Sequence, residues 1–101
     1  MSETETLTIL EWSRGGTSVH VDVHIDSLTG ALVMAGQDLG KAPLEAFGES
    51  EYEYFLSVKA ADKDRLLLHL MQQVFGGNET PRTAIAAWLD ARGIGYELAS
   101  F

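Results

Sequence analysis

The most distinctive chemistry in the sequence is a stretch in which carboxylates alternate with aromatic rings. Its members are Glu45, Phe47, Glu49, Glu51, Tyr52, Glu53, Tyr54 and Phe55. Aromatic rings supply contact area and cation–π faces, while carboxylates steer a cationic partner and pair with arginine. These residue types predict a surface for a basic protein partner, formed by Glu45, Phe47, Glu49, Glu51 and Glu53. The alternative is that strand alternation alone explains the aromatics, with Tyr52 and Tyr54 facing a core.

A second group of residues has the chemistry of metal ligands. His20, Asp22 and His24 alternate along one segment, and a hairpin would bring Glu11 opposite His20. Residues two apart on a strand are about 7 Å apart, whereas His20 and His24 would be about 13 Å apart, too far to share one ion. A metal or small-molecule site would therefore use Glu11, His20 and Asp22, or a further ligand from elsewhere such as His69 or Asp38. The alternative is a solvated strand face carrying an ordinary Glu–His pair.

No combination of residues identifies a reaction. The serines lack the context of a nucleophile elbow, and residues 36–40 (GQDLG) lack the lysine and hydroxyl residue of a phosphate loop. The absence of cysteine removes thiolate chemistry. We therefore expect a non-catalytic protein that needs no cofactor.

The charge of the chain favours a basic protein as partner. Fifteen acidic residues against seven basic ones give a net charge of −8. Such a field repels nucleic acids and anionic membranes and attracts cationic proteins. A basic nuclease or nucleic-acid-binding protein, which this chain would inhibit as an immunity or anti-defence factor, is the kind of partner that fits. The lack of cysteine, of a signal sequence and of a long apolar run predicts a cytoplasmic location.

Hydrophobic patterning near the N-terminus predicts a β-hairpin. Residues 6–13 and 17–25 are apolar and β-branched, and two glycines that suit a primed turn separate them. Counting outward from this turn places Thr8 on a mostly apolar face. Leu7 and Ile9 then lie on the opposite, mixed face. A homodimer formed through Leu7 and Ile9 is a further alternative function.

The middle of the chain predicts two more strands. Residues 31–36 form a short apolar run, and residues 52–58 alternate between apolar and polar side chains. The segment between them carries glycines and a proline, so we expect an excursion with one helical turn at 43–47.

The last third of the sequence changes to helical spacing. Apolar residues three and four apart predict a helix over 62–75, and Thr80 followed by Pro81 predicts the capped start of a second helix. Residues 94–100 alternate and predict a last strand. The resulting fold class is α+β: a single domain over 1–101, with a mainly antiparallel sheet of four to five strands in the order ββββααβ and two helices packed on one face. Residues 1–5 are predicted to be a disordered acidic tail.

Several segments resemble small acidic bacterial proteins of unknown function. They are GQDLG at 36–40, EYEYFLSV at 51–58, KDRLLLHL at 63–70 and the ending WLDARGIGYELASF. The resemblance covers most of residues 18–101. Because these motifs are strand and helix signatures, it implies the fold and a bacterial origin and assigns no functional residue.

Overall fold

The computed structural model describes residues 5–101 and has an α+β fold, as predicted. Contacts within the chain define two compact units, Met1–Lys63 and Asp64–Phe101, each of which is described by itself. The predictions that the whole chain is one domain and that its helices pack on the sheet therefore stay predictions. The predicted tail falls mainly on residues 1–4, outside the described part, and Glu5 is an exposed residue before the first strand.

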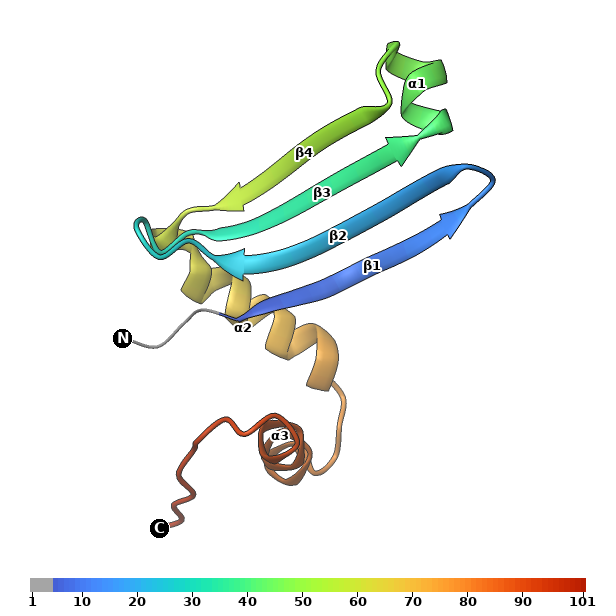
Figure 1. The fold of residues 1–101 in the computed structure, drawn as a ribbon. Helices are drawn as coiled ribbons and strands as arrows, with labels where there is room; N and C mark the ends of the chain where they lie inside the picture. The colour runs from blue at the N-terminus through green and yellow to red at the C-terminus, as the bar shows by residue number, and fades with distance from the viewer. Residues whose placement is uncertain (1–4) are drawn as a thin grey trace. The chain divides into compact units, whose positions relative to one another are not determined.

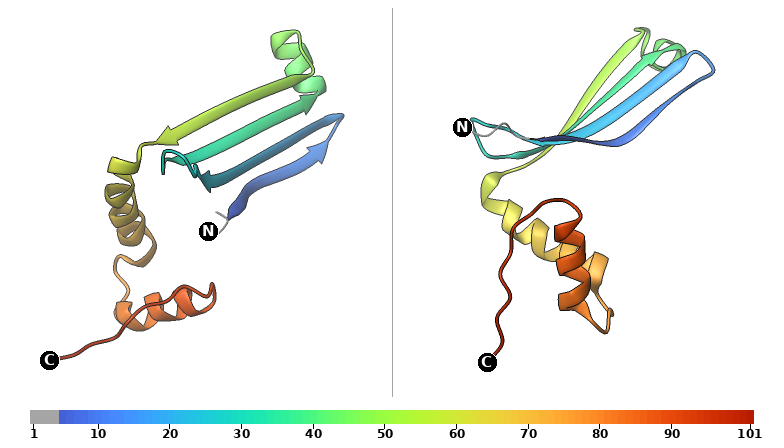
Figure 2. Two further views of the ribbon diagram at one scale, coloured as in Figure 1. Left: turned by 60° about the vertical axis from the view of Figure 1, so that its left-hand side comes forward. Right: turned by 60° about the horizontal axis from the view of Figure 1, so that its bottom comes forward.

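The first unit is a four-stranded antiparallel sheet whose strands lie side by side in chain order (Figure 1). The strands are β1 (Thr6–Arg14), β2 (Thr17–Ile25), β3 (Leu32–Gly40) and β4 (Glu51–Val58). The sheet has the twist usual for such strands, which the right-hand view of Figure 2 shows. β3 is longer than predicted, because Gln37 and Asp38 continue the pairing with β2 although polar residues break the apolar run there.

Near the turn, the hairpin of β1 and β2 has the predicted register. Gly15 and Gly16 have φ angles of 59° and 79°, the left-handed conformation that a primed turn requires. Glu11 consequently pairs with His20, as predicted.

Beyond this point, a β-bulge changes the register. The pairing shifts between Thr8 and Leu10, which leaves Ile9 as an extra residue. Leu7 therefore pairs with Val23 on the apolar side, and the predictions that Thr8 faces this side and that Leu7 and Ile9 form a mixed face are wrong. The physical reason is that regular pairing would have turned the apolar Leu7 toward the polar side.

The two faces of the sheet differ in chemistry. The side that we call the apolar face carries Leu7, Leu10, Trp12, Val19, Val21, Val23, Ile25, Leu32, Met34, Tyr52, Tyr54, Leu56 and Val58. Its centre is the core of the unit, where Val19 and Val21 are 9% and 7% exposed. The other side carries most of the polar residues of the strands.

A short helix, α1 (Lys41–Phe47), connects β3 to β4 at one end of the sheet (Figure 1) and confirms the helical turn predicted there. Gly40 precedes it and offers no side-chain cap. The hydroxyl of Thr17, which is buried, accepts a hydrogen bond of 3.0 Å from the backbone N–H of Ala42 instead. A residue of β2 thus supplies the helix cap.

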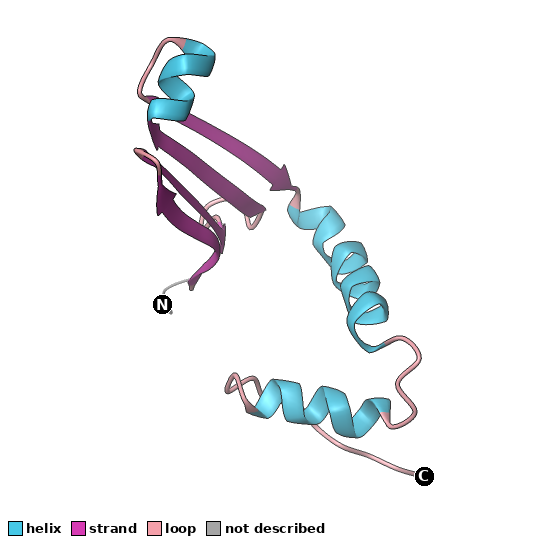
Figure 3. Ribbon diagram, turned by 90° about the vertical axis from the view of Figure 1, so that its right-hand side faces the viewer, coloured by secondary structure: helices cyan, strands magenta, loops and turns pink. Residues whose placement is uncertain are grey.

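The second unit contains the two predicted helices (Figure 3). The 3₁₀ turn Ala60–Asp62 leads into α2 (Lys63–Phe75), and α3 (Pro81–Asp90) follows. Thr80 occupies the N-cap position as predicted, but its side chain does not cap the helix, because its hydroxyl donates to Asn78. No helix within residues 5–101 is long and apolar enough to cross a membrane.

The predicted last strand over 94–100 is wrong, since these residues have no regular structure. This C-terminal segment instead lies along α3. The hydroxyl of Tyr96 donates a hydrogen bond to Asp90 at 3.0 Å, and Arg82 donates one to the carbonyl of Ala99 at 3.5 Å. Tyr96 and Leu98 line a groove with α3. The alternating apolar side chains therefore pack on a helix. An alternating sequence pattern alone does not distinguish this arrangement from a strand in a sheet.

Candidate acidic binding face

The polar side of the sheet brings together four carboxylates from three strands. These are Glu11 of β1, Asp22 of β2, and Glu51 and Glu53 of β4, and we call this side the acidic face. None of the described strand residues on this side is a lysine or an arginine. Arg14, the only basic residue within the four strands, pairs with Thr17 and lies 4.5 Å from the ring of Trp12, on the apolar side. Among the strand side chains, the acidic face therefore carries two histidines, His20 and His24, but no lysine or arginine.

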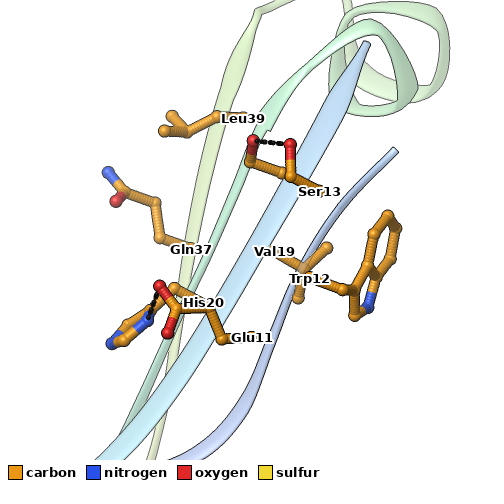
Figure 4. A pocket seen from close by; sticks show the side chains of 8 residues that line it. Glu11, Trp12, Ser13, Val19, His20, Gln37 and Leu39 are labelled. Atoms are coloured by element: carbon orange, nitrogen blue, oxygen red, sulfur yellow. Dashed lines mark hydrogen bonds and ion pairs between the residues drawn. The ribbon is translucent and has the colours of Figure 1, made fainter. Parts of the chain in front are cut away.

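A row of paired residues crosses the middle of this face. Glu11 pairs with His20, His20 with Gln37, and Gln37 with Glu53. Figure 4 shows Glu11, His20 and Gln37 on one side of the strands and Trp12 on the other. Because paired side chains on one face are neighbours, the row places polar groups side by side across the full width of the sheet.

His20 lies between two carboxylates. Its Nδ1 is 3.6 Å from Oε1 of Glu11, and its Nε2 is 3.1 Å from Oδ2 of Asp22. The three residues predicted as metal ligands are therefore neighbours, but the imidazole separates the two carboxylates, whereas ligands of one ion must converge on a point. Residues 5–101 contain no group of three or more His, Asp or Glu side chains arranged to hold a metal ion. The metal site stays a prediction, which metal analysis of the purified protein with His20→Ala as control would test.

At the edge of the sheet, Glu51 and Glu53 lie next to each other on β4. Hydrogen bonding and charge repulsion from Glu51 raise the pKa of Glu53. Glu51 also accepts a hydrogen bond of 2.8 Å from the side-chain amide of Gln37. The neighbouring carboxylate of Glu51 therefore favours the protonated form of Glu53.

Two hollows lie on the acidic face, on either side of His20 and Gln37. The larger, of about 330 Å³, includes Glu11, Ser13 and Leu39 in its lining. The smaller, of about 190 Å³, is lined by His20, Asp22, Ala35, Gly36, Gln37, Glu53 and Phe55. The small side chain of Ala35 opposite Phe55 leaves this space open. It offers a carboxylate on each side and an aromatic ring that is 65% exposed.

The five residues predicted to bind a partner divide between different surfaces. Glu51 and Glu53 lie on the acidic face, whereas Phe47 stacks on Tyr52 of the apolar face with ring centroids 4.4 Å apart. Glu45 lies on α1, 4.0 Å from Lys41. Glu49 is exposed in the loop before β4.

Three contributors to this face were not predicted to bind a protein partner. Asp22 and Glu11 were predicted only as metal ligands. Phe55 belonged to the stretch of alternating carboxylates and aromatic rings but was not among the five predicted partner-binding residues. The alternation of β4 together with the hairpin register could have placed these residues on one face. That inference also requires knowing that β3 lies between β2 and β4 and in which register it pairs with each.

No protein-family model matches the chain, and no curated protein or solved structure is significantly similar to it. The assignment of function therefore rests on the chemistry of the acidic face.

Proposed function

We propose that the protein is a non-catalytic binding module that recognises a basic protein through the acidic face. The observation that carries the proposal is the gathering of four carboxylates, two of them the mutually repelling Glu51 and Glu53, on a face whose strand side chains include no lysine or arginine. A cationic group from a partner would neutralise this repulsion. Binding of the partner would therefore also relieve the repulsion between the carboxylates of Glu51 and Glu53.

The smaller hollow suggests how a basic side chain would bind. An arginine or lysine placed over Ala35 would lie between the carboxylates of Asp22 and Glu53 and against the ring of Phe55. Carboxylates pair with guanidinium groups through charge-assisted hydrogen bonds, and an aromatic face attracts a cation. The hollow, at about 190 Å³, is of the size of a single side chain and too small for a folded element.

The partner class follows from charge. A chain with a net charge of −8 associates faster with a cationic protein, and nucleases and nucleic-acid-binding proteins carry cationic surfaces. The proposal therefore includes a role as a cytoplasmic inhibitor, immunity factor or anti-defence factor that covers such a surface.

Binding of a fluorescent oligoarginine peptide tests the proposal. The double variant E51Q/E53Q is expected to weaken binding by about three- to tenfold at low salt, and the difference should shrink as salt screens the charges. The variant E79Q/E97Q is the matched control, because it removes two exposed carboxylates and changes the net charge equally. Equal weakening by both variants would mean that net charge alone attracts the peptide, which contradicts a specific face.

A further inference from the structure

The two edges of the sheet are not equivalent. β1, at one edge, is interrupted by the bulge at Ile9, a feature that hinders pairing with another strand. β4, at the other edge, pairs regularly with β3 from Leu39↔Glu51 to Leu32↔Val58. It contains no proline, no lysine and no bulge, and no described strand lies on its outer side. An uninterrupted edge of eight residues is a template for another strand.

We propose that β4 pairs antiparallel with β4 of a second copy of this chain, so that two sheets join into one of eight strands. This proposal does not rest on the function proposed above, because the strands pair through backbone groups at the edge, although the interface shares Glu51 and Phe55 with the acidic face. An antiparallel pair related by twofold symmetry places equivalent faces on the same side. The acidic faces of the two copies would then form one continuous surface.

The sequence of β4 selects the register. Even-numbered residues of β4 lie on the apolar face and odd-numbered residues on the acidic face. Each residue must therefore pair with one from the same face, because otherwise the apolar face of one copy would continue as the acidic face of the other. With Phe55 on the twofold axis, Tyr54 pairs with Leu56 and Tyr52 with Val58, so the apolar face continues across the junction. The exposed ring of Phe55 meets its equivalent, which covers apolar surface on both copies.

Charge complementarity supports the same register. Glu51 at one end of β4 lies opposite Lys59, the residue that follows the other end, and symmetry forms this pair twice. Glu53 lies opposite Ser57, so no two carboxylates meet. With Tyr54 on the axis instead, Glu51 would lie opposite Ser57 and Glu53 opposite Phe55, and the pairing of Glu51 with Lys59 would be lost. The second copy is therefore a partner whose charges fit this edge.

Sedimentation of the full chain over a range of concentrations tests the proposal. The wild type is expected to reach a mass close to twice 11.0 kDa, and Phe55→Lys, which places two lysines at the axis, should weaken dimerisation at least tenfold. Ile9→Lys is the matched control, because Ile9 is 60% exposed on the opposite edge and Phe55 is 65% exposed. Ile9→Lys should leave the dimer intact. A chain that stays monomeric at high micromolar concentration, or a dimer that Ile9→Lys dissociates and Phe55→Lys does not, would overturn the proposal.

Charge reversal tests the register. Glu51→Lys and Lys59→Glu each place like charges at both ends of the interface, so each variant alone should dimerise about tenfold more weakly. Mixing them restores both opposite-charge pairs. Fluorescence anisotropy of labelled Glu51→Lys should therefore rise on addition of Lys59→Glu and remain low with unlabelled Glu51→Lys. Absence of the mixed dimer, while each variant retains the circular dichroism of the wild type, would contradict this pairing.

Discussion

The ring of Tyr54 lies across Gly36, its paired residue on β3, in the space that a Cβ atom at position 36 would occupy. Gly36 is buried, and an aromatic ring over a strand glycine restores the packing that the missing side chain cannot supply. Gly36→Ala must displace the ring, so we expect a loss of about 1–3 kcal/mol in the free energy of unfolding. Denaturant unfolding monitored by circular dichroism measures it.

Gly95→Ala is the control for this substitution. Gly95 has no positive φ angle, and a Cβ atom there would meet nothing within 4 Å. We expect a change within about 0.5 kcal/mol. If Gly36→Ala is equally mild, the ring of Tyr54 does not occupy this position.

The hydrogen bond between Thr17 and the start of α1 predicts a second effect on stability. Thr17→Val keeps the shape of the side chain and removes the acceptor for the N–H of Ala42. Because this bond replaces the missing N-cap, we expect a loss of about 1 kcal/mol. Thr17→Ser retains a hydroxyl and should lose less. A Thr17→Val protein as stable as the wild type would show that α1 does not depend on this cap.

Most elements of this fold follow from the sequence, because their patterns are local. The Gly15–Gly16 turn sets the pairing of Glu11 with His20, and alternation over residues 52–58 predicts β4 almost to its ends. The bulge at Ile9 was not predictable, since nothing local distinguishes a regular strand from one that turns Leu7 inward. The prediction of a strand over 94–100 was wrong for a related reason, because its alternating side chains fit a groove along α3 as well as a sheet.

The titration of Tyr54 reports on its surroundings. Burial is the main reason that its pKa is raised, and the carboxylate of Asp38, whose Oδ1 accepts a hydrogen bond of 3.3 Å from the Tyr54 hydroxyl, raises it further. Asp38→Asn removes the negative charge, so the pKa should fall and still lie above the ordinary value. Tyrosinate absorbance, measured with Tyr52 and Tyr96 replaced by phenylalanine, follows this group alone. An unchanged pKa would show that the two side chains do not interact.

The carboxylate pair on β4 predicts how binding depends on pH. Since Glu51 raises the pKa of Glu53, Glu53 takes up a proton at a higher pH than an ordinary glutamate. The protonated side chain cannot pair with arginine, so affinity for the oligoarginine peptide should weaken as pH falls through the raised pKa. Glu51→Gln removes the repulsion and should move this transition to lower pH. A transition at the same pH in both proteins would contradict the coupling of the two carboxylates.

The acidic face itself was only partly predictable. Glu51 and Glu53 were predicted as partner-binding residues, but Glu11 and Asp22 were considered only as ligands of a metal. That all four share a face depends on the strand order and on three successive registers. Each register is a long-range property, and an error of one residue in any of them would place the carboxylates on opposite sides.

The central claim is that the acidic face binds a cationic partner, and amide chemical-shift mapping with the oligoarginine peptide tests it most directly. We expect the largest perturbations on this face, at Asp22, Gln37, Glu53 and Phe55, with small ones at Val19 and Val21 of the core and in α3. In the same titration, the E51Q/E53Q variant should show smaller chemical-shift perturbations at these residues than the wild type. Perturbations confined to α1 or to the second unit, or spread evenly over all exposed carboxylates, would contradict the account.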